Sequence, residues 1–239
     1  MDQPELQFER ENALQLLIRL GADGIYLTSK LKSLNPVLSL IPARVYEIDG
    51  ELGTGKTQIC YSIASKFLET SKNGKIGWIS AIPLRTDVLQ KHLHDELHLD
   101  RLICRTPEHI PELLQSLDQL IDIQEAAKIQ LVFVEDVDAM LHDTAYQLHD
   151  KGRHYQFETI ERFNKLARKG VTVVVTNHMS RTNDGVPCPA LGQFWRQQVR
   201  NRFLVEKCEE TGVRSLSTLK NAQQIEVEFR IGANGLVDA

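Results

Sequence analysis

The chain has 239 residues, of which 42% are hydrophobic and 25% are charged. This length suits one large α/β domain or two small ones, and the composition argues against disordered, collagen-like and membrane-spanning classes. A formal net charge of −4 excludes a protein that binds nucleic acid through bulk positive charge, although a local basic patch is compatible with it. The four cysteines form no C-x-x-C pair, so we expect reduced thiols and neither a zinc site nor a disulfide framework.

The first predicted element is an amphipathic helix over residues 1–24, in which apolar residues recur at three- and four-residue steps before Gly21 and Gly24. This helical segment is too short to be a domain. The acidic residues around it are unlike a secretory leader, so we expect a cytosolic or nuclear protein. We expect residues 25–239 to form one domain, because the chain shows no internal repeat, low-complexity tract or linker.

Strands and helices then alternate along the chain, which is typical of a parallel sheet covered on both faces. The strands expected in the parallel part are 44–48, 76–80, 131–134 and 171–176, and amphipathic helices are expected around 59–68 and 110–121. After about residue 198 the pattern changes to short alternating runs at 202–207, 214–219 and 225–231. The predicted fold class is therefore α/β, with a mostly parallel twisted sheet flanked by helices and a C-terminal antiparallel edge.

A glycine-rich segment links the strand expected at 44–48 to the helix that follows it. It matches the phosphate-binding P-loop pattern G-x-x-x-x-G-K-[ST] at every fixed position, and this context disfavours a chance glycine-rich turn. In such a loop backbone N–H groups surround phosphate oxygens, Lys56 reaches the β- and γ-phosphates, and the Thr57 hydroxyl binds Mg²⁺. The predicted loop consists of Gly50, Glu51, Leu52, Gly53, Thr54, Gly55, Lys56 and Thr57.

A P-loop needs a further acid, at the end of a neighbouring strand, to hold the hydration shell of the metal ion. Glu135 and Asp136 directly follow the strand expected at 131–134. These two adjacent side chains point to opposite sides of an extended chain, so only one of them can face the metal. The pattern does not decide which one does. The alternative is that both acids simply stabilise the N-terminus of the next helix.

Four further segments share a pattern with one protein family. Thr57-Gln-Ile-Cys60 extends the P-loop in a way that most P-loop families lack, and Val173–His178 looks like a strand ending in Thr-Asn-Gln. Pro189–Gly192 together with Trp195 is similar to a second DNA-binding loop, and Phe229–Ala239 to the end of a recombinase core. From about residue 25 to the C-terminus, the chain therefore resembles the RecA-like eukaryotic Rad-type recombinases and their paralogues.

The resemblance implies a RecA-like core that binds ATP with Mg²⁺ between neighbouring protomers, and a nuclear role in homologous recombination, DNA repair and replication-fork protection. It adds Gln58 and His178 to the expected nucleotide-binding residues. The implied partners are a recombinase filament, another recombinase paralogue or a small accessory subunit, and single-stranded DNA, with no membrane. We expect no counterpart of the family's N-terminal helical DNA-binding domain, because only the short helix precedes residue 25.

Three positions depart from the family's pattern. Ile82 stands where the family has the acid that polarises the attacking water, and an isoleucine side chain can neither accept a proton nor orient water. Glu135 aligns with the family's metal-holding aspartate and is longer by one methylene group. His178 replaces the strand-end glutamine that senses the γ-phosphate. A histidine can still hydrogen-bond phosphate, but an ordinary surface histidine is an equal alternative.

The resemblance places two DNA-facing loops near 143–155 and 181–202. Their cations could neutralise phosphates, and Phe194 or Trp195 could stack on a base. The alternative, in which these aromatic residues are buried and the arginines form a solvated rim, is at least as well supported, so we expect weak affinity for single-stranded DNA. The candidate DNA-binding residues are Lys151, Arg153, Arg181, Arg196 and Arg200, with Arg202 adding to the local positive charge.

Three functions remain compatible with these residues. The favoured one is an ATP-binding recombinase paralogue with weak or absent ATPase activity, which stabilises or remodels a recombinase filament on single-stranded DNA. The second is an active DNA-dependent ATPase that performs strand exchange itself, and Ile82 argues against it. The third is a small P-loop kinase, which would not normally combine its metal acid with the Thr-Asn-His strand and basic loop seen here.

Overall fold

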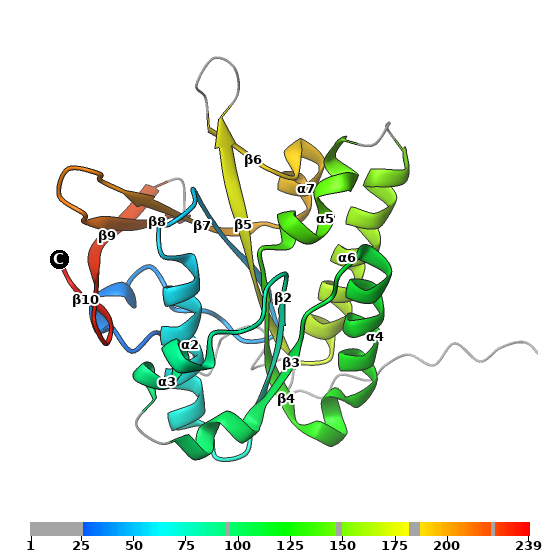
Figure 1. Ribbon diagram of the computed structural model, residues 1–239, viewed down its shortest axis with the longest axis horizontal. Coiled ribbons are helices and arrows are strands. Elements are labelled where there is room, and N and C mark those ends of the chain that lie inside the picture. The colour runs from blue at the N-terminus through cyan, green and yellow to red at the C-terminus, as the bar shows by residue number, and fades with distance from the viewer. Residues whose placement is uncertain (1–25, 94–95, 147–149, 182–186, 221–222) are drawn as a thin grey trace, which may run out of the picture.

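A ten-stranded sheet forms the centre of the protein, with helices on both faces (Figure 1). The computed structural model describes residues 26–93, 96–146, 150–181, 187–220 and 223–239. The helix expected over 1–24 lies outside these residues. Along the sheet the strands follow the order β10-β9-β8-β7-β1-β5-β4-β2-β3, and β6 pairs with β5. The predicted α/β class with a mostly parallel sheet and an antiparallel C-terminal edge is confirmed.

Six neighbouring strands run parallel: β3, β2, β4, β5, β1 and β7. Successive residues of a strand point to opposite faces of the sheet, so in β4 Leu131 and Phe133 join one hydrophobic core while Val132 and Val134 join the other. Both faces are thus buried, which explains the continuous apolar runs in the sequence. The strands before β7 are β1 (Val45–Gly50), β2 (Lys75–Ser80), β3 (Leu102–Arg105), β4 (Ile129–Glu135) and β5 (Thr172–Arg181).

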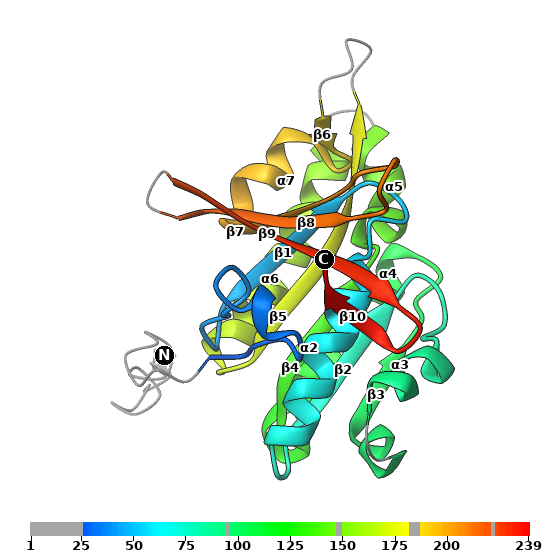
Figure 2. The ribbon, with the colours of Figure 1, turned by 90° about the vertical axis from the view of Figure 1, so that its left-hand side faces the viewer.

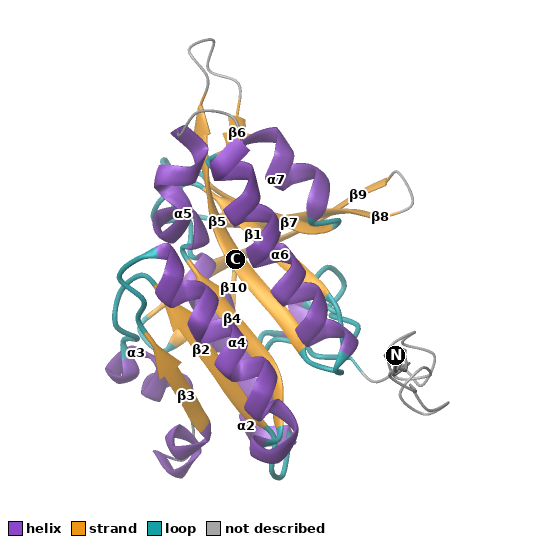
Figure 3. Ribbon diagram, turned by 90° about the vertical axis from the view of Figure 1, so that its right-hand side faces the viewer, coloured by secondary structure: helices purple, strands orange, loops and turns teal. Residues whose placement is uncertain are grey.

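The helices form one layer on each face of the sheet (Figures 1 and 3). One layer contains α2 (Lys56–Thr70), α3 (Thr86–His92) and the short 3-10 helices η1 (Lys32–Leu34) and η2 (Glu96–Arg101). The other contains α4 (Ile110–Ala127), α5 (Val137–Tyr146), α6 (Asp150–Arg168) and α7 (Gly192–Gln198). None of the described helices combines the length and apolarity that crossing a lipid bilayer requires.

The C-terminal strands form the antiparallel part of the sheet, as the alternating pattern predicted (Figure 2). They are β7 (Asn201–Lys207), β8 (Arg214–Lys220), β9 (Gln223–Gly232) and β10 (Gly235–Asp238). Because β7 runs parallel to β1 and antiparallel to β8, it joins this part to the parallel strands. The arrangement brings β8 and β9 close to the segment that follows β1.

Two segments differ from the sequence-based expectation. The described residues of the loop expected near 143–155 are helical, because they belong to α5 and to α6, whose buried Ile160 and Phe163 anchor it on the sheet. The strand expected to end at Thr176 continues to Arg181. Its last residues pair antiparallel with β6 (Pro187–Pro189), so β5 becomes one arm of a hairpin beyond the parallel strands (Figure 1).

Candidate nucleotide-binding site

The carboxyl ends of β1, β5 and β4 bring the candidate phosphate-binding and metal-binding residues to one edge of the sheet. Gly50 at the end of β1 is the register partner of His178 on β5. On the other side of β5, β4 ends at Glu135. Ligand sites of open α/β sheets lie at the carboxyl ends of the strands, so this edge is the candidate site.

The loop after β1 depends on glycine at two positions. A Cβ atom on Gly50 would lie 2.6 Å from the Val205 carbonyl oxygen on β7, which leaves no space for a side chain. Gly55 has a φ of +107°, a backbone conformation that residues with a Cβ rarely adopt. Gly55 is also the N-cap of α2, and no side chain caps this helix end. The first-turn N–H groups of α2 are therefore open to an anion, as phosphate binding requires.

Lys56 is buried beneath this loop. Its Nζ donates hydrogen bonds to the Gly50 carbonyl at 2.8 Å and to the Glu51 carbonyl at 3.0 Å. Burial lowers the pKa of Lys56, while the carboxylates of Asp136 and Asp138 act in the opposite direction. A cation held by neutral carbonyls in a partly desolvated place suits an anionic ligand. The loop and Lys56 therefore fit a nucleotide phosphate.

The remaining loop residues take different positions. Thr54 is buried, and its hydroxyl donates to the Glu51 carbonyl at 2.9 Å, which holds the turn together. The Leu52 side chain is 86% exposed and Glu51 is also exposed, so both are candidates for contact with another molecule. Gln58 points elsewhere, because its Oε1 lies 3.0 Å from the His92 Nε2 of α3. Its predicted contact with nucleotide stays a prediction.

Glu135 lies against the start of α2. Its Oε2 accepts a hydrogen bond from Trp78 Nε1 at 2.9 Å, and burial raises the pKa of Glu135 to about 7. The hydrogen bond from Trp78 and the nearby Thr57 hydroxyl act against this increase. Glu135 and Thr57 thus bring a carboxyl group and a hydroxyl group together, and these are oxygen ligands of the kind that Mg²⁺ prefers. The residues present fit a magnesium ion beside the phosphate loop.

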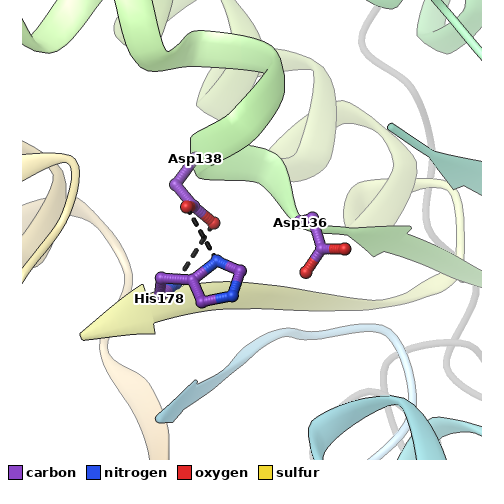
Figure 4. A group of neighbouring side chains, drawn as sticks. All are labelled: Asp136, Asp138 and His178. Atoms are coloured by element: carbon purple, nitrogen blue, oxygen red, sulfur yellow. Dashed lines mark hydrogen bonds and ion pairs between the residues drawn. The ribbon is translucent and has the colours of Figure 1, made fainter. Parts of the chain in front are cut away.

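Asp136 does not continue β4 as an extended residue, because its φ is +52°. The expectation that Glu135 and Asp136 alternate across an extended chain is therefore wrong at this point. The Asp136 N–H donates to the Thr176 hydroxyl at 2.8 Å, and its carboxyl group lies near Asp138 and His178 (Figure 4). The two adjacent acids thus have different neighbours: Glu135 lies near Thr57, and Asp136 belongs to a cluster on α5 and β5.

Ile82 lies just beyond β2 and is 61% exposed. Its backbone N–H donates to the Ser80 hydroxyl at 3.4 Å, and Ser80 is the register partner of Glu135. The position is thus near the metal-binding edge, but its side chain is an alkyl group. It offers no group that could activate a water molecule.

A buried polar network lies behind the phosphate loop, on β1, β5, β7 and α7. Glu47 is fully buried, and its Oε1 accepts hydrogen bonds from Trp195 Nε1 at 2.6 Å and Asn177 Nδ2 at 2.9 Å. Arg202 pairs with Glu47 Oε2 at 2.6 Å and with Asp49 Oδ2 at 3.0 Å. The network therefore links the strand before the phosphate loop to the neighbouring strands and to α7.

No protein-family model matches the chain. A RAD51-like protein 1 from Caenorhabditis briggsae is 50% identical over 245 residues, which cover 99% of this chain and 98% of that protein. A RAD51-like protein 1 from Caenorhabditis elegans is 46% identical over 246 residues, with the same coverage of both chains. The chain belongs to this RAD51-like protein family. A mouse protein named DNA repair protein RAD51 homolog 4 is 29% identical over 84% of this chain and 67% of its own length.

Among solved structures, the RadB recombinase superposes with a TM-score of 0.74 at 20% identity, covering 89% of this chain and 99% of its own. This likeness shows that the fold is RecA-like. The resemblance to recombinase paralogues inferred from the P-loop extension and the Thr-Asn-His strand is confirmed.

The candidate DNA-binding residues of this RAD51-like chain are spread over several elements. Arg153 is exposed on α6, and Arg196 and Arg200 are exposed on α7 and just after it. Lys151 begins α6 and Arg181 ends β5, but their side chains lie outside the described part of the structure. The role of these five residues in DNA binding stays a prediction.

Two residues that the family resemblance places near DNA instead interact with other residues of the protein. Trp195 is fully buried and hydrogen-bonded to Glu47, so it cannot stack on a base in this conformation. Arg202 pairs with Glu47 and Asp49 and does not add to a free positive patch. The alternative of buried aromatic residues therefore holds for Trp195, while Phe194 is half-buried.

Sequence reasoning missed two neighbours of the site. Asp138 lies in the first turn of α5 and contacts His178, and the spacing Glu135-Asp136-x-Asp138 after a buried strand was the signal that could have indicated it. Arg214 on β8 lies beside the phosphate loop, since a Cβ atom on Gly55 would be 3.5 Å from its Cδ. No local pattern could have indicated Arg214, because only the strand order brings it to the loop.

Proposed function

We propose that this protein is an ATP-binding recombinase paralogue that acts in the nucleus, where it stabilises or remodels a recombinase filament on single-stranded DNA in homologous recombination, DNA repair and replication-fork protection. The observation that supports this most directly is a phosphate loop that fits a nucleotide, combined with an alkyl side chain at Ile82. Such a chain can use ATP as a bound ligand without rapid turnover. The name of its mouse relative, DNA repair protein RAD51 homolog 4, points to DNA repair.

In this proposal Lys56 and the first-turn N–H groups of α2 bind the phosphates, and Thr57 and Glu135 hold the magnesium ion. Magnesium supplies charge neutralisation of the phosphates when it is bound. Glu135 is favoured over Asp136 as the magnesium acid because it lies beside Thr57 and because its buried Oε1 has no hydrogen-bond partner among the described residues. Asp136 instead lies in a group with Asp138 and His178.

Lys56→Ala tests nucleotide binding. We expect ATP affinity to fall by about 30-fold or more, since the variant loses a partly desolvated charge that pairs with phosphate. Isothermal titration calorimetry with ATP and Mg²⁺ measures this, with Lys165→Ala on the exposed face of α6 as the matched lysine control. Equal ATP affinity of Lys56→Ala and the unchanged protein would contradict the nucleotide site.

ATP hydrolysis is expected to be slow or undetectable, with or without single-stranded DNA. Loss of a positioned general base typically lowers a rate by about 10²- to 10⁴-fold, and Ile82 provides no such base. Phosphate release under saturating ATP measures the rate. A turnover on the order of one per second or faster would show that another residue activates water. The alternative of an active DNA-dependent ATPase would then be favoured.

The filament role follows from the position of the nucleotide in recombinase assemblies. In these assemblies ATP lies between neighbouring protomers. The contact between the protomers is heterologous, which means that each subunit uses two different faces. A paralogue that keeps the phosphate-loop face can join such a contact, and Leu52 and Ile82 are exposed apolar groups on that side. Another recombinase paralogue or a small accessory subunit would bind through the same phosphate-loop face. Bound ATP would raise the affinity for the filament by mass action.

The test is the dissociation rate of recombinase from single-stranded DNA with substoichiometric amounts of this protein. We expect dissociation to slow at least twofold in the presence of ATP, and Lys56→Ala to lose the effect while Lys165→Ala keeps it. An unchanged rate would overturn the filament role. Long filaments formed by the protein alone on DNA would instead favour strand exchange by the protein itself.

A further inference from the structure

Asp136, Asp138 and His178 form a compact group of potential metal ligands next to the phosphate loop (Figure 4). Each offers one ligand atom, and these atoms lie within 4.8 Å of one another. The three residues come from separate elements: Asp136 follows β4, Asp138 lies in the first turn of α5, and His178 lies in β5. All three are partly buried. The proposed nucleotide function gives Asp138 no role.

Asp138 holds the His178 ring in one orientation. Its Oδ2 lies 2.8 Å from His178 Nδ1, and its Oδ1 accepts a hydrogen bond from the His178 backbone N–H at 3.1 Å. When Nδ1 carries the proton that the carboxylate accepts, Nε2 is left with a free lone pair. Histidine ligands of metal ions usually have this carboxylate partner on their other ring nitrogen. The pair is therefore arranged as a metal-binding histidine and its orienting acid.

Asp136 supplies a second ligand group from a different direction. Figure 4 shows its carboxyl group to one side of the imidazole ring, while Asp138 approaches the ring from α5. The hydrogen bond from the Asp136 N–H to Thr176 fixes the backbone at this position. Both candidate ligands are thus anchored on strands of the sheet, which favours a preformed site.

The charges around the group favour a cation. Asp136 and Asp138 bring two carboxyl groups within 4.8 Å of each other. The ammonium group of Lys56 is close enough to interact with both, but it supplies one positive charge for two carboxylates. A divalent ion between Asp136 and His178 would offset the excess negative charge.

We propose that Asp136 and the Nε2 of His178 bind a divalent transition-metal ion of the Mn²⁺ class, with Asp138 as the residue that positions His178. A mixed set of carboxylate oxygen and imidazole nitrogen suits first-row transition-metal ions better than Mg²⁺ or Ca²⁺, which prefer oxygen ligands alone, and Mn²⁺ is the ion of that series that also favours carboxylate oxygen. The group contains no thiolate, which disfavours the softer metals. This site is separate from the magnesium proposed at Thr57 and Glu135, and it does not require nucleotide.

The test uses the nucleotide-free protein and Mn²⁺ alone. The electron paramagnetic resonance signal of free Mn²⁺ disappears when the ion binds, so a titration measures affinity and stoichiometry. We expect one site per chain, and a loss of affinity of about tenfold or more in His178→Gln and in Asp138→Asn. His109→Gln is the matched control, because His109 also pairs with a carboxylate, that of Glu112 at 3.6 Å, but on the exposed surface.

Direct ligation has its own signature. The spin-echo modulation of bound Mn²⁺ should contain the nitrogen coupling of one imidazole, and His178→Gln should remove this coupling while His109→Gln keeps it. Absence of Mn²⁺ binding in the unchanged protein, or nitrogen coupling that persists in His178→Gln, would overturn the proposal. Circular dichroism spectra of the variants check that each is folded. Because no ATP is present, failure of Lys56→Ala to change ATP affinity would contradict the nucleotide site alone.

Discussion

The phosphate loop and the polar network behind it use charged side chains in opposite ways. In the loop, the Lys56 ammonium group donates to two backbone carbonyls, and among the described residues no side chain caps the N-terminus of α2. In the network, the Arg202 cation is paired with the carboxylates of Glu47 and Asp49. The loop is therefore open to an external anion, while the network largely satisfies its charges internally.

This difference shows that the identity of a cationic residue does not reveal its role. Arg202 and Trp195 lie in a sequence stretch that looked suited to DNA, yet both are bound to a glutamate on the strand before the phosphate loop. Loss of a residue in the loop should affect ligand binding, whereas loss of a residue in the network should affect folding stability. Three variants of the network and one double variant of exposed arginines test how far role follows from position, from the largest expected effect to the smallest.

Arg202→Ala should lower the free energy of unfolding by about 3–5 kcal/mol, because it leaves the fully buried Glu47 carboxylate without its ion-pair partner. Urea denaturation followed by circular dichroism measures the change. The control is Arg196→Ala on the exposed face of α7. Its free energy of unfolding should stay within about 0.5 kcal/mol of that of the unchanged protein. If Arg202→Ala lowered stability as little as Arg196→Ala, the network would not stabilise the fold in the way that distinguishes it from the loop.

Trp195→Phe should lower the free energy of unfolding by about 1–3 kcal/mol, since it removes the N–H that donates to Glu47 while keeping an aromatic ring in the core. The same unfolding measurement applies. In a Glu47→Gln background the cost of Trp195→Phe should differ by at least 0.5 kcal/mol, because the two residues are in contact. Strictly additive costs would show that Trp195 stabilises the protein by packing alone.

Asp49→Asn should change how stability depends on pH. Burial and the neighbouring Glu47 raise the pKa of Asp49 from 3.8 to about 8. The folded state therefore retains a proton that the unfolded chain releases near pH 4, so this contribution to stability is full below that pH and is lost as the pH rises through about 8. Asp49→Asn should flatten this decline, by on the order of 1 kcal/mol between pH 7 and 8. Asp122→Asn on exposed α4 is the control, and an unchanged slope in Asp49→Asn would contradict the shift.

Arg196→Ala combined with Arg200→Ala should have the smallest effect. If both side chains contact phosphates, the variant weakens an already weak binding to single-stranded DNA. The slope of the logarithm of the binding constant against the logarithm of the salt concentration should then become shallower by about 0.7 per lost contact. Fluorescence anisotropy of a labelled oligonucleotide over a range of salt concentrations measures this. Arg168→Ala, at the far end of α6, is the arginine control. The same slope in both variants would show that Arg196 and Arg200 belong to a solvated rim.

Much of the fold could be predicted because its signals are local. The phosphate loop is contiguous, and continuous apolar runs give buried parallel strands because both faces of the sheet are covered. The short alternating runs after about residue 198 are also a local signal, and they predicted the antiparallel edge. The family resemblance predicted a loop at 143–155, but its described residues are helical, because the apolar spacing of α6 packs Ile160 and Phe163 onto the sheet.

The sequence by itself determined the loop that can bind phosphate, the strands that end beside it and the alkyl group at Ile82. Only the tertiary structure decided the partners of the charged side chains. Arg202 meets Asp49 across 153 residues of sequence, Trp195 meets Glu47 across 148, and His178 meets Asp138 across 40. These pairs exist because β1 lies between β5 and β7, and because β5 lies beside β4. Strand order depends on the packing of the whole chain, so no local pattern contains it.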